Sequence, residues 1–171
     1  MSSNTKEKWT LKHIVKEILS TLVLFFFLSL LINYLRQPNI TENIYDYKLQ
    51  DIKGNSIDFS SYEGKPLVVH FWGTWCPTCR IETSNIEDIS ENYNLISIVV
   101  NSGENKAIKE FMEEHELTFR VVNDQSSNVA NKFNIGAYPT TLIYDSKGKL
   151  KFTEMGYSTK VGLKARLEFI N

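Results

Sequence analysis

The chain has 171 residues, a length that suits one domain with an appendage. Its 42% hydrophobic and 23% charged residues are the proportions of an ordinary globular protein. The formal net charge of −1 offers no basis for binding nucleic acid, so no nucleic-acid partner is expected.

The N-terminal segment contains an apolar run typical of a membrane anchor. Residues 18–35 include no charged side chain, and as a helix they would span about 27 Å, close to the hydrocarbon thickness of a bilayer. Four lysines precede this run and only Arg36 follows it closely. The positive-inside rule therefore places residues 1–17 in the cytoplasm and the C-terminal domain outside. We expect a transmembrane anchor over 18–35 and a polar tether over 36–44.

A cleaved signal peptide is the main alternative for this segment. The run is longer than the apolar region of a signal peptide, and no small-x-small cleavage site follows it. No cysteine lies near its end, which excludes a lipoprotein anchor. A buried soluble helix is disfavoured because a polar domain would struggle to cover a helix that is apolar all round. An uncleaved anchor is the favoured interpretation.

Residues 45–171 alternate between strand and helix patterns. Two short alternating segments, 45–49 and 56–59, predict an N-terminal hairpin around residues 51–55. Further strands are expected over 67–72, 95–100, 119–122, 140–144 and 149–154, and helices over 77–92, 104–115, 127–133 and 159–170. Such alternation predicts an α/β domain with a sheet covered on both faces and an antiparallel hairpin late in the chain.

Cys76 and Cys79 are the only cysteines, and Pro77 and Thr78 separate them. This is the spacing of a dithiol that can close and open a disulfide at the start of a helix. Free N–H groups and the positive end of the helix dipole would favour the thiolate of Cys76. Because Cys79 lies one turn later, we predict that Cys76 attacks and Cys79 resolves the mixed disulfide, with swapped roles as the alternative.

A metal site is the competing interpretation of the cysteine pair. Zinc needs four ligands, and the rest of the domain offers only His70 and His115, which have no ligand spacing. A location outside the cytoplasm also favours disulfide chemistry. Capture of copper by the dithiol stays open as an alternative, but no metal is expected in the favoured interpretation.

Residues 71–80 (FWGTWCPTCR) resemble the active site of thioredoxin-fold proteins. More narrowly, the chain is similar to the membrane-anchored periplasmic thioredoxin-like proteins of bacteria. These include the cytochrome c biogenesis thiol reductases and the suppressor-of-copper-sensitivity D type. The second group shares the short tail with one anchor, the stretch 122–124 and the pattern over 156–167. The resemblance covers essentially the whole chain and implies a thioredoxin fold over 45–171, with a central mixed sheet, an N-terminal hairpin extension and no cofactor beyond the dithiol.

A second signature lies at residues 136–140 (GAYPT). The resemblance implies that the bond between Tyr138 and Pro139 is cis and lies beside the dithiol, whereas the alternative is a trans proline that starts a strand. It also implies that the Tyr138 backbone binds a substrate segment as an added strand. Trp75 would offer a flat apolar rim to the substrate, and we include Pro77 and Thr78 among the substrate-binding residues.

Two further residues are candidates for proton relay or tuning. His70 stands where thioredoxin-like proteins often carry a buried acid or an Asn. It would either relay a proton to Cys79 or be a core histidine bonded to a backbone carbonyl, and both interpretations stay open. Glu82 matches the Cys-Arg-x-Glu pattern of related reductases, but the proline that follows in them is absent, and Thr83 and Ser84 stand there instead. A solvated helix carboxylate is therefore the favoured interpretation of Glu82.

Together these features predict a single-pass protein of the bacterial inner membrane whose catalytic domain faces the periplasm. We expect a monomeric thiol–disulfide oxidoreductase that reduces protein disulfides and exchanges electrons with a membrane partner. The direction of electron flow is not readable from the dithiol itself. The alternatives are a dedicated cytochrome c biogenesis reductase and a copper-binding module. A peroxidase of the peroxiredoxin type is disfavoured because its catalytic cysteine would not usually have a partner three residues away.

Overall fold

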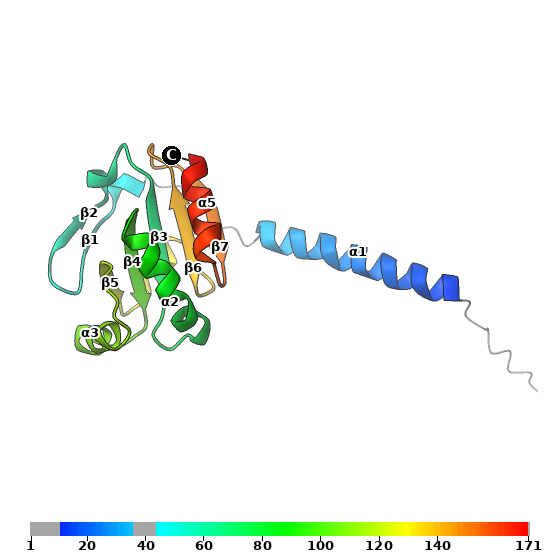
Figure 1. The fold of residues 1–171 in the computed structure, drawn as a ribbon, viewed down its shortest axis with the longest axis horizontal. Helices are drawn as coiled ribbons and strands as arrows, with labels where there is room; N and C mark the ends of the chain where they lie inside the picture. Colours follow the sequence, from blue (N-terminus) through cyan, green and yellow to red (C-terminus); the bar gives the residue numbers. More distant parts are fainter. Residues whose placement is uncertain (1–10, 36–43, 171) are drawn as a thin grey trace, which may run out of the picture. The chain divides into compact units, whose positions relative to one another are not determined.

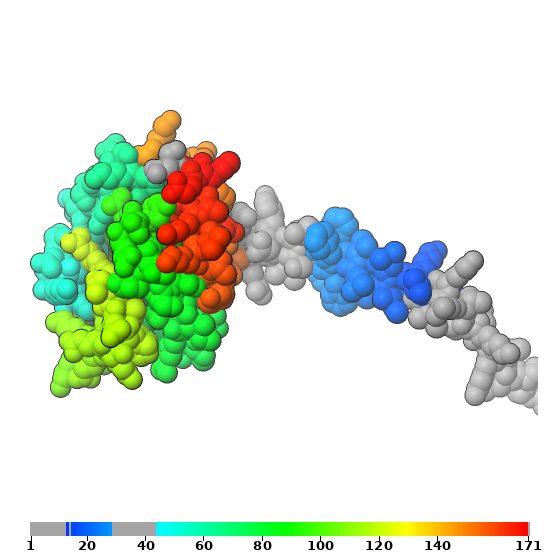
Figure 2. Space-filling view, in the orientation of Figure 1, coloured from blue at the N-terminus to red at the C-terminus, as the bar shows by residue number. Residues whose placement is uncertain are grey.

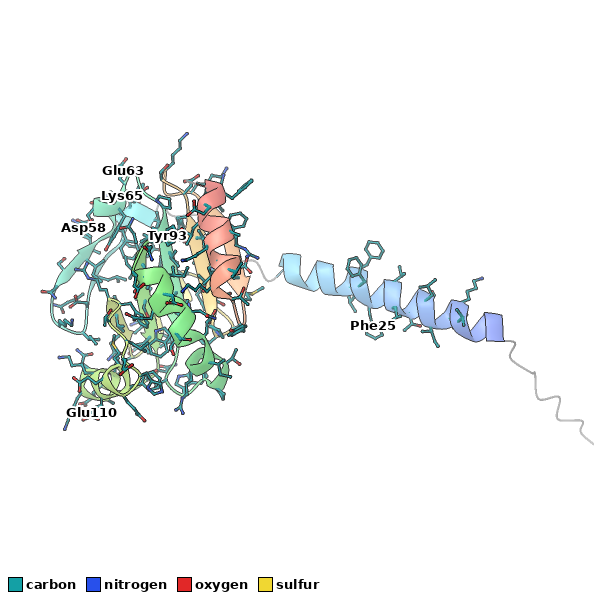
Figure 3. The ribbon with its side chains drawn as sticks, viewed as in Figure 1. Phe25, Asp58, Glu63, Lys65, Tyr93 and Glu110 are labelled. Carbon is teal, nitrogen blue, oxygen red and sulfur yellow. A yellow bond between two sulfur atoms is a disulfide. The ribbon has the colours of Figure 1, made fainter. Side chains whose placement is uncertain are left out.

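A computed structural model describes residues 11–35 and 44–170. Residues 1–10 of the tail predicted over 1–17 and most of the tether predicted over 36–44 lie outside the described residues. The chain divides into two compact units, residues 1–37 and 38–171. In the first unit, helix α1 (Leu11–Leu35) contains the whole apolar run, and Phe25, labelled in Figure 3, is one of its exposed side chains. Within the described residues, no helix is both long enough and apolar enough to cross a membrane. The predicted anchor therefore gains no support here.

The second unit is built on a five-stranded mixed sheet (Figure 1). Its strands in spatial order are β5 (Val121–Asp124), β4 (Asn94–Val100), β3 (Leu67–Trp72), β6 (Thr140–Tyr144) and β7 (Leu150–Met155). Strands β3, β4 and β5 run parallel, whereas β6 and β7 form the antiparallel hairpin. The predicted mixed sheet is confirmed, although the strand expected over 119–122 begins two residues later.

Helices cover both faces of this sheet, as predicted. They are α2 (Pro77–Ser90), α3 (Asn105–Glu114), α4 (Asn128–Lys132) and α5 (Lys160–Ile170). Side chains alternate along β3, so Val68 and Trp72 pack with α2, α3 and α5, while Val69 and Phe71 face α4 and the N-terminal hairpin. All six residues of β3 are buried because the strand is central and covered on both sides.

Helices α2 and α5 lie side by side on one face of the sheet, as Figures 1 and 2 show. Tyr93, labelled in Figure 3, follows α2 and donates its hydroxyl to the Glu168 carboxylate on α5. Lys160 at the start of α5 forms an ion pair with Asp88 on α2 at 2.6 Å. These contacts bring the C-terminal helix against the helix that carries the dithiol.

The N-terminal hairpin is confirmed as strands β1 (Lys48–Gln50) and β2 (Ser56–Asp58), which pair antiparallel. It is shorter than predicted because two 3-10 helices, η1 (Ile44–Asp46) and η2 (Phe59–Tyr62), replace its outer ends. Asp58, labelled in Figure 3, caps η2 by accepting a hydrogen bond from the Ser60 N–H at 3.1 Å. In the hairpin turn, the Ile52 N–H donates to the Val121 carbonyl at 2.9 Å, so the hairpin pairs with the β5 edge of the sheet.

The apolar residues of α2 do not all face the core. Ile81 is apolar, yet its side chain is 68% exposed. The buried face instead carries Cys79, Glu82, Ile86 and Ile89, which recur at intervals of three and four residues. Ile81 falls between these positions and therefore points away from the sheet.

Candidate active site

The two cysteines lie where β3 ends and α2 begins. Cys76 is the N-cap of α2, Pro77 occupies its first turn, and Cys79 completes that turn, so the predicted start of the helix is confirmed. A disulfide joins the cysteines, whose Cα atoms are 5.2 Å apart. The Cys79 N–H donates to Cys76 Sγ at 3.3 Å. The main chain of the helix therefore offers a hydrogen bond directly to the first sulfur.

The cysteines differ in their exposure. Cys76 is 6% exposed, whereas Cys79 is fully buried in the core cluster shared with α3 and α5. Of the two cysteines, only Cys76 keeps any surface accessible to solvent. This difference agrees with the predicted order of attack, in which Cys76 reacts first.

The loop that leads into α2 is held by polar contacts on both sides. The Cys76 N–H donates to the Gly73 carbonyl at 3.1 Å, and the Thr74 N–H donates to Ser102 Oγ at 3.0 Å. Arg80 Nε donates to the Thr74 carbonyl at 2.6 Å. The backbone before the dithiol is thus tied to both the β4–α3 loop and the first turns of α2.

Trp75 is half exposed beside the dithiol and has a fixed ring position. Its Nε1–H donates to the Val100 carbonyl at 3.0 Å, and its ring meets the Tyr138 ring edge-on at 5.6 Å between centroids. A Cβ at Gly73 would come within 2.6 Å of the indole, so only glycine lets the ring lie against the backbone there. Trp75 and Tyr138 together form an aromatic surface next to Cys76.

The bond between Tyr138 and Pro139 is cis, as predicted. The Tyr138 carbonyl oxygen lies 3.7 Å from Cys76 Sγ, although the two residues are 62 positions apart in the chain. The loop before β6 and the start of α2 therefore meet at the first sulfur. The role of Tyr138 and Pro139 in substrate binding stays a prediction.

His70 is buried, with 1% of its surface exposed, on the central strand β3. It faces the same side of the sheet as Val68 and Trp72, which pack in one core cluster with Cys79. Its Nδ1 lies 2.9 Å from Thr141 Oγ1, so its polar partner is a hydroxyl on β6 and not the backbone carbonyl that one of the two interpretations named. Burial lowers the pKa of His70 to about 3, so the imidazole is neutral at physiological pH.

Glu82 is fully buried, and its predicted solvated position is wrong. The Ser158 N–H donates to Glu82 Oε1 at 2.8 Å, while Oε2 has no hydrogen-bond partner among the described residues. Burial raises the pKa of Glu82 to about 7, an effect that the Ser158 hydrogen bond opposes. The prediction failed because the loop that covers this side of α2 comes from a distant part of the chain.

Comparison with known proteins agrees with this geometry. A family model described as the AhpC/TSA family matches residues 40–153. The chain is 36% identical over 129 residues to the thiol-disulfide oxidoreductase ResA of Geobacillus kaustophilus, which covers 73% of this chain and 74% of the relative. The chain belongs to the thioredoxin-like thiol-disulfide oxidoreductases. A thioredoxin-like protein of Haemophilus influenzae is 31% identical over 161 residues, or 93% of this chain and 96% of the relative.

Solved structures show the same fold. A secreted Mycobacterium tuberculosis disulfide oxidoreductase homologous to E. coli DsbE has a TM-score of 0.67 and 21% identity, and covers 75% of this chain and 99% of its own. StoA from Bacillus subtilis has a TM-score of 0.63 and 22% identity, and covers 72% of this chain and 98% of its own. The thioredoxin fold predicted from the residues around the dithiol is therefore confirmed.

Sequence reasoning missed two residues that shape the site of this oxidoreductase. Ser158 supplies the N–H for Glu82, and Asn85 Nδ2 donates to the Ser158 carbonyl at 3.0 Å. Ser158 belongs to the stretch 156–158 quoted for the family resemblance, but only a structure places that stretch against α2. Asn85 lies three residues after Glu82, and residues at this spacing are neighbours on a helix surface. This spacing is the one signal in the sequence that links the two side chains.

No group of three or more His, Cys, Asp or Glu side chains that could hold a metal ion occurs within residues 11–35 and 44–170. The two histidines considered as zinc ligands have other contacts. His70 contacts Thr141, and His115 stacks on Phe111 with 4.0 Å between ring centroids. The redox group of an oxidoreductase of this family is its own disulfide, here formed by Cys76 and Cys79.

Proposed function

We propose that this oxidoreductase reduces protein disulfides outside the cytoplasm while tethered to the membrane by residues 18–35. The main support for this reaction is the different exposure of the two cysteines. Cys76 keeps 6% of its surface exposed at a helix N-terminus, whereas Cys79 is fully buried in the first turn of the same helix. Such a pair can form a mixed disulfide at one sulfur and resolve it with the other.

The exchange has two steps. The Cys76 thiolate attacks one sulfur of a substrate disulfide; a Cys76–substrate bond forms, the substrate bond breaks, and the other substrate sulfur leaves as a thiolate that takes up a proton. Cys79 then loses its proton and attacks Cys76 Sγ, which releases the second substrate sulfur. The substrate gains two electrons and two protons, and the enzyme is left with the Cys76–Cys79 disulfide.

The start of α2 favours the attacking thiolate. The Cys79 N–H already points at Cys76 Sγ, and the positive end of the helix dipole stabilises negative charge at that sulfur. Because Pro77 has no N–H, it costs no hydrogen bond in the first turn of the helix. The Cys79 N–H and the helix dipole therefore lower the free energy of the Cys76 thiolate, although the residue is largely buried.

The substrate segment would lie along the surface formed by Trp75, Tyr138 and Pro139. The Tyr138 backbone precedes an antiparallel strand and lies beside Cys76 Sγ, which suits main-chain pairing with an extended substrate segment. The exposed Trp75 ring would cover the apolar part of that segment, and Pro77 and Thr78 would line its other side.

Deprotonation of the buried Cys79 needs a base, and Glu82 suits this role better than His70. Glu82 is one helical turn after Cys79 on the same buried face, and its Oε2 accepts no hydrogen bond from the described residues. A base works best when its pKa lies near the working pH. The pKa of Glu82 is about 7, whereas that of His70 is about 3.

The membrane tether rests on the sequence. Residues 18–35 carry no charge, and the lysines that precede them indicate a cytoplasmic N-terminus. An enzyme so anchored in a bacterial inner membrane would face the periplasm as a single-pass monomer and receive electrons from a membrane partner. Carbonate extraction of membranes from expressing cells tests the tether. The full chain should stay in the pellet, and release into the supernatant would contradict it.

The reduction potential of the full chain in dithiothreitol or glutathione buffers tests the direction of electron flow. A value near or below about −250 mV supports a reductant, whereas about −120 to −180 mV would indicate an oxidase or an isomerase. Reduction restricted to the haem-binding cysteines of a cytochrome precursor would favour the cytochrome c biogenesis alternative. A tight Cu(I) complex without a reversible two-electron couple would favour the copper-binding module.

A further inference from the structure

The loop between β7 and α5, residues 156–158, connects two parts of the active site that are distant in the chain. At its first residue, the Gly156 N–H donates to the Pro139 carbonyl at 2.8 Å, next to the cis peptide bond. At its last residue, the Ser158 N–H donates to Glu82 Oε1 at 2.8 Å. Gly156 has a φ of +88°, a backbone conformation that glycine adopts without strain. This loop therefore runs from the turn that contains the cis peptide bond to the buried carboxyl.

Asn85 holds the loop against α2. Its Nδ2 donates at 3.0 Å to the Ser158 carbonyl and at 3.0 Å to the Tyr157 hydroxyl. The carboxamide is half-buried between the loop and the helix, next to the place where α2 meets α5. The donation to its carbonyl holds Ser158, whose N–H is a donor to Glu82, and the donation to the Tyr157 hydroxyl ties the neighbouring residue to the same helix.

We propose that Asn85 is a positioning residue for thiol–disulfide exchange. By holding Ser158 in place, it keeps Glu82 Oε1 occupied and leaves Oε2 as the oxygen that exchanges a proton with Cys79. This inference rests on the proposed role of Glu82 as the base for Cys79. Asn85 acts only through the loop, because it lies six residues after Cys79, about 9 Å further along the helix axis.

The dependence on Asn85 follows from the surroundings of Glu82. Among the described residues, the hydrogen bonds that stabilise the Glu82 carboxylate come from Ser158, and Oε2 has no partner. A buried carboxylate whose hydrogen bonds come from one residue loses its main stabilisation if that residue moves. Glu82 would then hold its proton to higher pH, and fewer enzyme molecules would carry the base needed for resolution.

The test compares the full chain with its Asn85→Leu variant, which removes both donations but keeps a helix-favouring side chain of similar size. Asn85→Ala is the second variant if Asn85→Leu fails to fold. Asn92→Leu is the matched control, because Asn92 is an exposed asparagine just beyond the same helix. Glu82→Gln identifies the Glu82 resonance and removes the proposed base.

The first measurement is a pH titration of the Glu82 carboxyl. Its chemical shift is monitored by NMR in chains labelled with ¹³C at the glutamate carboxyl. We expect Asn85→Leu to raise the midpoint by about half a pH unit or more, while Asn92→Leu leaves it unchanged. The second measurement mixes reduced protein with 5,5′-dithiobis(2-nitrobenzoate). The first thionitrobenzoate leaves when Cys76 attacks and the second when Cys79 resolves. In Asn85→Leu, the pH dependence of the rate of the second phase should shift to higher pH by as much as the Glu82 titration does.

The two measurements separate this inference from the proposed function. Coincident Glu82 titrations in the wild type and Asn85→Leu would overturn the positioning role of Asn85. A second phase whose pH profile is unchanged in Glu82→Gln would instead overturn the role of Glu82 as base, and with it the catalytic part of the inference. A raised Glu82 midpoint together with a shifted second phase in Asn85→Leu, and neither change in Asn92→Leu, would support both.

Discussion

Glu82 and Ser158 are 76 residues apart in the chain, yet the Ser158 N–H donates a 2.8 Å hydrogen bond to the Glu82 carboxylate inside the core. Glu82 lies one helical turn after the resolving cysteine, and Ser158 comes from the loop before α5. The contact therefore joins the redox helix to the C-terminal part of the fold. It also holds a titratable group with a pKa of about 7 on the buried face of the helix that carries the dithiol.

The buried carboxyl of Glu82 should make stability fall as the pH rises. The pKa of Glu82 moves from its ordinary value of 4.5 to about 7 in the folded state, so between these values the folded chain binds more protons than the unfolded chain. The free energy of unfolding should decrease across this window by up to about 3 kcal/mol from this group. Urea unfolding of the oxidised wild type and Glu82→Gln at pH 4.5 and 7.5 measures the difference, and equal pH dependence in both would contradict it.

Neutral, buried His70 should have the opposite effect in acid. The pKa of His70 is lowered from 6.5 to about 3, so between these values the unfolded chain binds more protons, and stability is lost as the pH falls from 6.5 toward 3. His70→Asn keeps a side chain that can reach Thr141 but removes this titration. Between pH 6.5 and 4, the free energy of unfolding should fall by about a few kcal/mol less in the variant than in the wild type, as measured by urea unfolding.

The same variant tests the relay interpretation of His70. Because a group with a pKa near 3 is a weak base at neutral pH, the resolution rate of His70→Asn should follow the wild-type profile from pH 5 to 8. Stopped-flow release of the second thionitrobenzoate gives this rate. A large loss confined to the upper part of the range would restore His70 as the proton acceptor of Cys79.

The two cysteines should differ in what their loss does to the reaction. Cys79→Ser should accumulate a mixed disulfide with a protein substrate such as insulin, because Cys76, which keeps 6% of its surface exposed, still attacks and nothing resolves the product. Cys76→Ser should abolish turnover and form no such adduct, since Cys79 is fully buried. Non-reducing gels and intact-mass spectrometry measure the adducts. An adduct only with Cys76→Ser would mean that the roles are swapped.

Gly73→Ala should weaken substrate binding and spare the chemistry. The added Cβ would meet the Trp75 indole at 2.6 Å, which forces the ring away from its hydrogen bond to Val100. We expect a several-fold higher KM for a protein disulfide, with an unchanged rate of Cys76 alkylation by iodoacetamide. Gly136→Ala is the matched control, because a Cβ there meets nothing within 4 Å. An unchanged KM in Gly73→Ala would mean that Trp75 does not contact the substrate.

Several elements were predictable because local sequence determines them. The strand over 67–72 is an apolar run that only a central position can bury, and its bounds are confirmed. The helix after the dithiol starts at Pro77 because proline fits a first turn and breaks later ones. The two-residue spacing of Cys76 and Cys79 likewise predicts a disulfide at a helix start, since one turn separates the sulfurs.

Tertiary contacts decided what local pattern could not. Glu82 looked like a solvated carboxylate because a charged residue on a helix is exposed unless another segment covers it, and the covering loop is 76 residues away. His70 could be predicted as buried, but its threonine partner depends on the register between β3 and β6. By itself, the sequence determined the reactive pair and the helix that activates it. Only the folded chain decided which acids and bases surround that pair, because burial and hydrogen bonding depend on segments distant in the chain.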